Sequence, residues 1–177
     1  MGTLKNGDFA LDFRLPGVDG KNYSLKDFKA KKAVIVMFSC NHCPTVKAYE
    51  NRFVELQRDY RDEAVMLIAI NPNDEKSYPE DSFENMKIRA KEKGFNFPYL
   101  RDESQKVAKA YGAERTPEVF VFDEKRTLRY HGRIDDNVYE PNQVSQHYLR
   151  DALNALLEGR KILLEDTEPV GCTIKWK

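Results

Sequence analysis

The chain has 177 residues, of which 41% are hydrophobic and 33% charged, and its 29 basic and 29 acidic residues leave a formal net charge of zero. This length is typical of one globular domain, and a chain without net charge has no general attraction for nucleic acid. The longest uninterrupted apolar run, residues 64–70, is far shorter than the roughly 18 residues needed to cross a bilayer. We therefore expect neither nucleic acid nor a membrane as a partner.

Patterns of apolar residues predict strands and helices in alternation. Alternation with a period of two indicates hairpin strands, continuous β-branched runs indicate buried strands, and spacings of three and four indicate amphipathic helices. In chain order we expect a leading hairpin over 9–25, a strand at 33–38, a helix over 45–60, a strand at 64–70, a helix over 77–94, a short strand at 95–100, a short helix at 104–111, strands at 118–122 and 128–131, and a last helix over 144–156.

Two finer predictions concern the region before the second helix. Ser77 and Glu80 have the spacing of a capping box that would begin this helix. The segment 71–81 is rich in Asn, Asp and Glu but lacks the spacing of a calcium loop, so we expect it to be solvated.

The order of these elements predicts the fold class and the domain organisation. Strands that alternate with helices predict an α/β domain, with a central mixed sheet flanked by helices on both faces. No internal repeat or Gly/Ser linker divides the chain. We expect residues 1–160 to form one domain and residues 161–177 to form a C-terminal tail that packs on it.

The motif that carries chemistry is Cys40-Asn41-His42-Cys43-Pro44, placed between a predicted buried strand and a predicted helix. Unpaired amides and the dipole at a helix start stabilise a thiolate, so we expect the pKa of Cys40 to lie below about 8.5. The spacing predicts thiol–disulfide exchange, in which Cys40 attacks and Cys43 resolves the mixed disulfide. A partly protonated His42 would favour the Cys40 thiolate.

At these residues the sequence resembles the thioredoxin superfamily, and within it the redoxin or AhpC/TSA-like branch that contains the TlpA/ResA-type reductases and the peroxiredoxins. The resemblance covers most of the chain and rests on the strand–CxxC–helix unit, on the inserted strand and helix that follow it, and on Thr116-Pro117 before the strand at 118–122. The phrase NHCPTVKAYE and the ending GCTIKWK are similar to a bacterial subfamily of thioredoxin-like proteins.

The resemblance implies a thioredoxin-like fold with an N-terminal β-hairpin and an inserted strand and helix. It also implies that Pro117 is cis and faces the cysteine pair, which would place the backbone of Thr116 beside Cys40, where it could bind an extended substrate segment. Many thioredoxins carry a buried aspartate six residues before the first cysteine, but here that residue is Val34. The group that takes the proton of Cys43 is therefore not identified.

Two other functions compete with disulfide exchange. The run Cys43-Pro44-Thr45 is similar to the segment that follows a peroxiredoxin's peroxidatic cysteine, so a thiol peroxidase is the main alternative. A metal carrier would use Cys40, Cys43 and a histidine such as His131, but no further ligands have paired spacing. We expect no metal and no cofactor, and an ordinary structural role for His131.

The third cysteine, Cys172, has two readings. We favour a tail that only packs on the domain, because Trp176 supplies a large apolar side chain for this packing and Cys172 then needs no redox role. The alternative makes Cys172 a third redox thiol that reaches the Cys40–Cys43 pair, within one chain or across a dimer.

The sequence therefore predicts a thiol–disulfide oxidoreductase that acts on a disulfide-containing protein and is recycled by a thiol reductant. The catalytic residues would be Cys40, Cys43 and His42, and Thr116 and Pro117 would bind the substrate. The N-terminus shows no secretory signal, so we expect a cytoplasmic protein, either a monomer or a homodimer.

Overall fold

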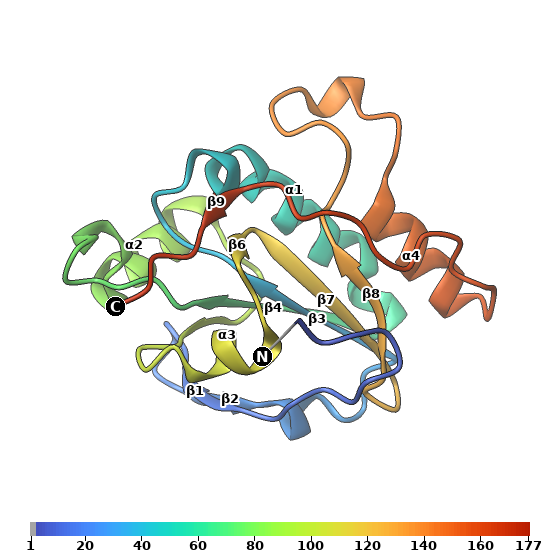
Figure 1. Ribbon diagram of the computed structural model, residues 1–177, viewed down its shortest axis with the longest axis horizontal. Coiled ribbons are helices and arrows are strands. Elements are labelled where there is room, and N and C mark those ends of the chain that lie inside the picture. The colour runs from blue at the N-terminus through green and yellow to red at the C-terminus, as the bar shows by residue number, and fades with distance from the viewer. Residues whose placement is uncertain (1–2) are drawn as a thin grey trace.

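The computed structural model describes residues 3–177, so the first two residues of the predicted domain lie outside it. Figure 1 shows the elements. The strands are β1 (Arg14–Pro16), β2 (Asn22–Ser24), β3 (Ala33–Phe38), β4 (Val65–Asn71), β5 (Tyr99–Arg101), β6 (Arg115–Thr116), β7 (Glu118–Asp123), β8 (Leu128–Gly132) and β9 (Cys172–Thr173). The α-helices are α1 (Pro44–Tyr60), α2 (Phe83–Lys93), α3 (Lys106–Tyr111) and α4 (Tyr148–Leu157).

Strand β3 lies at the centre of a five-stranded sheet with the order β5-β4-β3-β7-β8. It runs parallel to β4 and antiparallel to β7. All six residues of β3 are buried, as the continuous β-branched run predicts. The mixed sheet and the leading β1–β2 hairpin confirm the predicted fold class.

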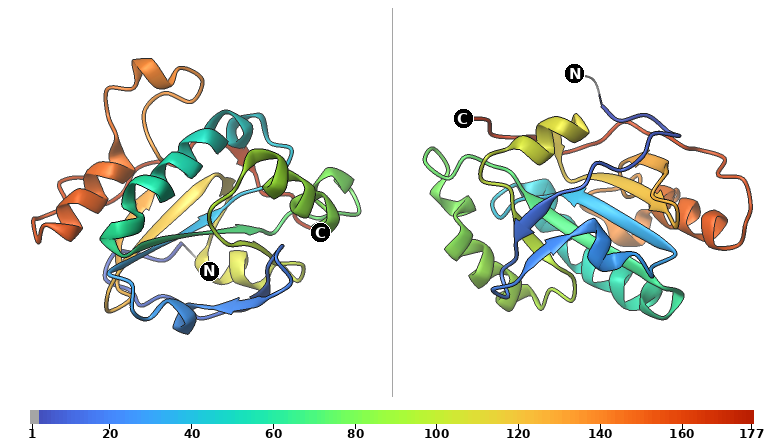
Figure 2. Two further views of the ribbon diagram at one scale, coloured as in Figure 1. Left: turned by 180° about the vertical axis from the view of Figure 1, so that it is seen from behind. Right: turned by 90° about the horizontal axis from the view of Figure 1, so that it is seen from below.

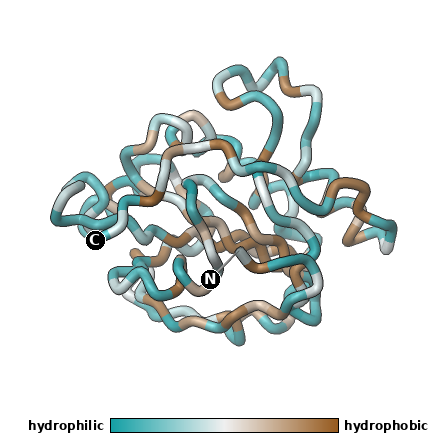
Figure 3. The backbone as a smooth tube through the Cα atoms, viewed as in Figure 1, coloured by the Kyte–Doolittle hydropathy of each residue, from teal (hydrophilic) through white to brown (hydrophobic). Residues whose placement is uncertain are grey.

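Helices cover both faces of this sheet, as predicted (Figures 1 and 2). Helices α1, α2 and α4 contribute Tyr49, Met86 and Leu153 to an apolar core that includes Ile35 of β3. Helix α3 and the N-terminal segment cover the opposite face, where their side chains meet the alternate residues of β3. Figure 3 shows the hydrophobic residues concentrated in the central strands. None of the helices described between residues 3 and 177 is both long and apolar enough to span a membrane.

The start of the second helix differs from the prediction. Helix α2 begins at Phe83, and the hydroxyl of Ser82 accepts a hydrogen bond from the backbone N–H of Asn85 at 3.1 Å. The predicted capping box of Ser77 with Glu80 was therefore wrong. Ser82 caps the helix instead, because a 3₁₀ turn over Pro79–Asp81 occupies the predicted first turn.

The segment 71–81 is only partly solvated, because residues 76, 77, 79 and 80 are exposed while others in it are buried. The side chains of Asn71, Asn73 and Asp81 are almost completely buried. They avoid water because they bond to one another and to the segment that contains the first cysteines. This polar cluster places acidic and amide groups next to the predicted site.

The C-terminal tail runs from α4 across the domain (Figure 1) and ends beside the loop before α2, where the backbone N–H of Asp74 donates to the carbonyl of Lys175. Its strand β9 pairs antiparallel with β6, with Thr173 opposite Arg115 and Cys172 opposite Thr116. The end of the sequence therefore lies against the segment predicted to bind substrate.

Candidate functional site

The fold places the CxxC motif where the sequence predicts it, between the end of β3 and the start of α1. Pro44 is the first residue of α1, where its missing N–H costs no hydrogen bond, and Cys43 is the N-cap. Cys40 and Cys43 are only 2% and 1% exposed. Neither sulfur is open to a large substrate in this arrangement.

The predicted neighbour of the two cysteines is also in place. The peptide bond between Thr116 and Pro117 is cis. The hydroxyl of Thr116 lies 3.4 Å from the sulfur of Cys40, and its carbonyl oxygen lies 3.5 Å from the sulfur of Cys43. Thr116 therefore contacts both cysteines, one with its side chain and the other with its backbone.

The disulfide in the structure joins Cys43 to Cys172, and Cys40 is a free thiol. The Cα atoms of Cys43 and Cys172 are 6.2 Å apart, within the range that disulfides occupy. The predicted docking of the tail is confirmed, because β9 pairs with β6 and Ile174 is buried. The disulfide is in addition to this docking, and a redox role for Cys172 stays a prediction. The tail docks and also brings a third sulfur to the motif, because β9 pairs with β6 beside it.

The pKa of the Cys40 thiol also differs from the expected direction. Burial raises it to about 11, and the negative charge of Asp81 acts in the same direction. Hydrogen bonds from Thr116 and from nearby backbone groups oppose these effects but do not outweigh them. The prediction of a lowered pKa fails because Cys40 lies outside the first turn of α1, in an almost dry position.

Asp81 is a site residue that the sequence analysis missed. Its carboxylate is fully buried and accepts hydrogen bonds from the backbone N–H of Asn41 at 2.6 Å and from the side-chain amide of Asn73 at 3.0 Å. It also bonds to Nδ1 of His42. The ring of His42 stacks on Tyr78, with centroids 5.3 Å apart. Asp81 thus fixes the two residues between the cysteines.

A second polar cluster supports the other side of the site. The buried carboxylate of Glu118 accepts hydrogen bonds from the backbone N–H groups of Glu114 and Arg115. Its second oxygen lies 2.7 Å from Nε2 of His131, whose Nδ1 lies 2.7 Å from Asp166. His131 therefore orders the segment before Thr116 and does not approach the cysteines as a ligand.

The structure brings three groups of metal-binding type together. The ligand atoms of Cys40, His42 and Asp81 all lie within 4.8 Å of one another. In this structure Nδ1 of His42 is bonded to Asp81, so the same atoms already have a structural role.

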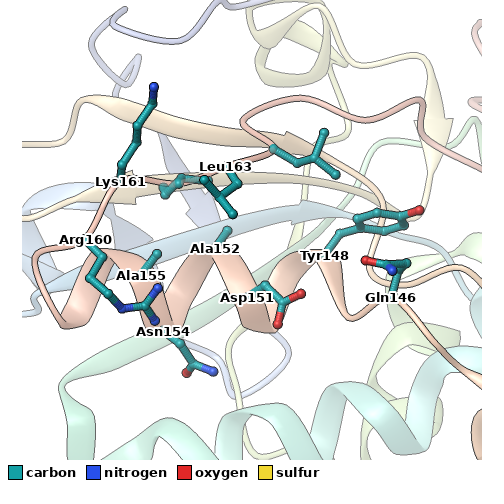
Figure 4. Close-up of a pocket in the computed structure, with 11 residues that line it drawn as sticks. Gln146, Tyr148, Asp151, Ala152, Asn154, Ala155, Arg160, Lys161 and Leu163 are labelled. Atoms are coloured by element: carbon teal, nitrogen blue, oxygen red, sulfur yellow. The ribbon is translucent and has the colours of Figure 1, made fainter.

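Away from the cysteines, a pocket of about 310 Å³ lies between α4 and the chain that follows it. Figure 4 shows its lining, which includes Tyr148, Ala152, Arg160 and Leu163. None of the predicted site residues lines this pocket. It therefore adds nothing to the cysteine site.

Comparisons with known proteins identify a conserved protein, a thiol-disulfide oxidoreductase and a peroxiredoxin as relatives. A crystal structure of a conserved protein from Geobacillus kaustophilus is 46% identical, with a TM-score of 0.91, and the match covers 98% of this chain and 93% of that one. The thiol-disulfide oxidoreductase ResA of Geobacillus thermodenitrificans is 25% identical, with 80% of this chain and 75% of ResA covered. The chloroplastic peroxiredoxin Q of Triticum aestivum is 26% identical, with 80% of this chain and 64% of the peroxiredoxin covered.

The model of the AhpC/TSA family matches residues 6–131. This range contains the CxxC motif, Asp81 and the cis-proline, but it ends before the tail with Cys172. Because the match covers well over half of the sequence, the chain belongs to the AhpC/TSA family.

Proposed function

We propose that this protein is a thiol–disulfide oxidoreductase that reduces a disulfide in a protein partner and uses three cysteines, Cys40, Cys43 and Cys172. The observation that carries the proposal is a disulfide between Cys43 and Cys172 directly beside the free thiol of Cys40. Similarity to ResA supports the same class of activity. Similarity to peroxiredoxin Q keeps peroxide reduction as a less supported alternative.

The exchange begins when the Cys40 thiolate attacks one sulfur of the substrate disulfide. A Cys40–substrate mixed disulfide forms, and the other substrate sulfur leaves as a thiolate. The Cys43 thiolate then attacks the Cys40 sulfur, which releases the second substrate thiol and leaves a Cys40–Cys43 disulfide. The substrate has gained two electrons and the pair has lost them.

The third cysteine accounts for the disulfide in the structure. The Cys172 thiolate attacks the sulfur of Cys43, which forms the Cys43–Cys172 bond and regenerates the Cys40 thiolate. Two molecules of an external thiol then reduce this bond and become oxidised to a disulfide themselves. Cys172 is more exposed than Cys40 and Cys43, so it offers this reductant the more accessible sulfur.

His42 and Thr116 have supporting roles in this proposal. His42, which Asp81 orients, provides an imidazole beside the Cys40 thiol for proton transfer when the thiolate forms or leaves. Thr116 contacts both sulfurs and offers backbone groups to an extended segment. We propose the reducing direction for a cytoplasmic setting, where thiols are kept reduced.

Reduction of insulin, followed by the precipitation of its free B chain, tests this function. We expect the full-length protein with dithiothreitol to accelerate precipitation, and Cys40→Ser to lower the rate at least 100-fold. Cys172→Ser separates the two halves of the cycle, because it keeps the CxxC pair but removes the third sulfur. It should still complete the first turnover, but its Cys40–Cys43 disulfide must then be reduced directly by dithiothreitol.

Peroxide consumption distinguishes the alternative. Full activity of Cys40→Ser towards insulin would contradict the proposed role of Cys40. Rapid peroxide consumption that requires Cys43 but not Cys40, together with no insulin reduction, would replace the proposal with a peroxidase.

A further inference from the structure

We propose that the tail residues 171–177 occupy the binding site of the substrate segment, and that partners bind there as an extended strand with glycine directly before the reactive cysteine. The tail and the substrate would then compete for the same edge of β6. This inference rests on the proposed function and deepens it, because it names the substrate class and a control on access.

The first observation is that the tail already pairs with β6 in the way that an extended substrate segment is expected to pair. Strand β9 pairs antiparallel with β6, and Cys172 lies opposite Thr116. Two residues further, the backbone N–H of Ile174 donates to the carbonyl of Glu114 at 2.9 Å. This edge of β6 is therefore filled by the protein's own chain, so a partner can pair with it only after the tail has left.

The second observation concerns Gly171. A Cβ atom at this position would lie 2.1 Å from the carbonyl oxygen of Thr116 and 2.7 Å from its carbonyl carbon. These are backbone atoms next to the cis-proline, so they cannot turn away as a flexible side chain could. Only glycine fits directly before a cysteine held opposite Thr116, and the same limit applies to any segment bound in this register.

The third observation is that the docked tail is firmly anchored beside a buried pair of cysteines. Cys40 and Cys43 are buried while the tail is docked. The tail is anchored beyond the strand pair, because the side chain of Ile174 is buried in the core and the backbone N–H of Lys175 donates to Asn73 at 2.9 Å. Asn73 in turn donates to Asp81. Substrate can reach Cys40 only when these contacts open.

A single-turnover assay with two peptides tests the inference. Each peptide is a mixed disulfide with glutathione: one has the tail sequence Glu-Pro-Val-Gly-Cys-Thr-Ile-Lys-Trp-Lys, and the other has Ala in place of Gly. Prereduced full-length protein is mixed with each peptide, and released glutathione is measured over time. Cys40 attacks the peptide sulfur and glutathione leaves as a thiol, after which Cys43 releases the peptide thiol.

We expect the glycine peptide to react at least tenfold faster than the alanine peptide. Ile174→Asp, which removes the buried anchor of the tail, should accelerate both peptides several-fold. Ile88→Asp is the matched control, because it makes the same substitution at an exposed position of α2, outside the tail, and should leave the rates unchanged. Thermal melts verify that both variants are folded, and Gly171→Ala serves as a second tail-loosening variant.

Equal rates for the two peptides would overturn the glycine requirement, and rates unchanged by Ile174→Asp and by Gly171→Ala would overturn the occupancy of the site by the tail. Insulin reduction by the same preparations separates these failures from failure of the proposed function. If the protein reduces insulin but shows no peptide preference, only the inference about the tail is overturned and the proposed function stands. If the protein reduces neither insulin nor the peptides, the proposed function is overturned as well.

Discussion

Thr116 and Cys172 lie opposite each other in two antiparallel strands, and Thr116 contacts the sulfurs of both cysteines of the CxxC motif. Cys172 is bonded to Cys43, so three sulfurs gather around one threonine. Two of them come from the segment between β3 and α1, and one comes from the last residues of the chain. This arrangement explains why the tail is part of the site although the family match ends before it.

Replacing Asp81 with Asn should lower the pKa of Cys40 from its raised value of about 11. The charge of Asp81 contributes to that increase, while burial would still keep the pKa above its ordinary value. The measurement is the pH dependence of iodoacetamide alkylation of Cys40 in a Cys43→Ser, Cys172→Ser background. We expect a several-fold faster reaction at pH 8.

Asp74→Asn is the matched control for that change, because Asp74 lies in the same segment but is not among the charges that act on Cys40. An alkylation profile that responds equally to both substitutions would show that Asp81 has no specific effect on the thiol.

Gly171→Ala should loosen the tail, because the added methyl group would overlap the backbone of Thr116. Trypsin cleavage after Lys175, followed by mass spectrometry, measures this effect in the prereduced protein. We expect cleavage at least tenfold faster than in the unchanged protein and in the Thr173→Ala control. A tail that resists trypsin equally in all three proteins would be inconsistent with the close approach to Thr116.

Cys172→Ser should lower the free energy of unfolding of the oxidised protein by about 3 kcal/mol, as is typical when a disulfide that closes a long loop is lost. The bond joins residues separated by 129 positions. Urea unfolding with and without dithiothreitol makes the comparison. The difference should disappear under reducing conditions, and a difference that persists there would point to packing of the side chain instead of the bond.

The cluster around His131 predicts a pH dependence of stability. Burial lowers the pKa of His131, but hydrogen bonds and charges of Glu118 and Asp166 outweigh it, so the folded-state pKa is above the usual 6.5. A raised pKa means that the folded state holds the proton more tightly. The added stability is complete below about pH 6.5 and is lost as the pH rises through the folded-state pKa.

Urea unfolding between pH 6 and pH 9 checks this prediction. The free energy of unfolding should fall with rising pH in the unchanged protein, and the fall should be smaller in His131→Gln. His147→Gln is a control for removal of a histidine outside this cluster. Identical slopes for the unchanged protein and His131→Gln would contradict the assignment.

Local patterns were enough to predict the fold and the position of the CxxC motif. The continuous apolar run of β3 and the spacing in α1 each depend on neighbouring residues only, and both elements form close to where they were predicted. The cis-proline beside the pair followed from the family resemblance and is present. These features confirm the thioredoxin-like fold and agree with the oxidoreductase class.

What the sequence could not reveal depends on contacts between distant residues. Asp81 lies 40 residues from Asn41, and the segment around it looked like a solvated loop because its residues are polar. Asn71, Asn73 and Asp81 are nevertheless buried, because they satisfy one another's hydrogen bonds, which composition alone does not show. The raised pKa of Cys40 follows from the burial of Cys40 itself and from the charge of Asp81. The pairing of Cys172 with Cys43 likewise requires the register of β6 with β9.

A redox titration tests the central claim most directly. The full-length protein is equilibrated with glutathione couples of graded potential, free thiols are trapped, and disulfides are mapped by mass spectrometry. The account predicts a two-electron transition that ends in a Cys43–Cys172 disulfide with Cys40 free, and a Cys40–Cys43 disulfide in the Cys172→Ser variant. A protein in which Cys43 forms no disulfide with either cysteine at any potential would contradict it.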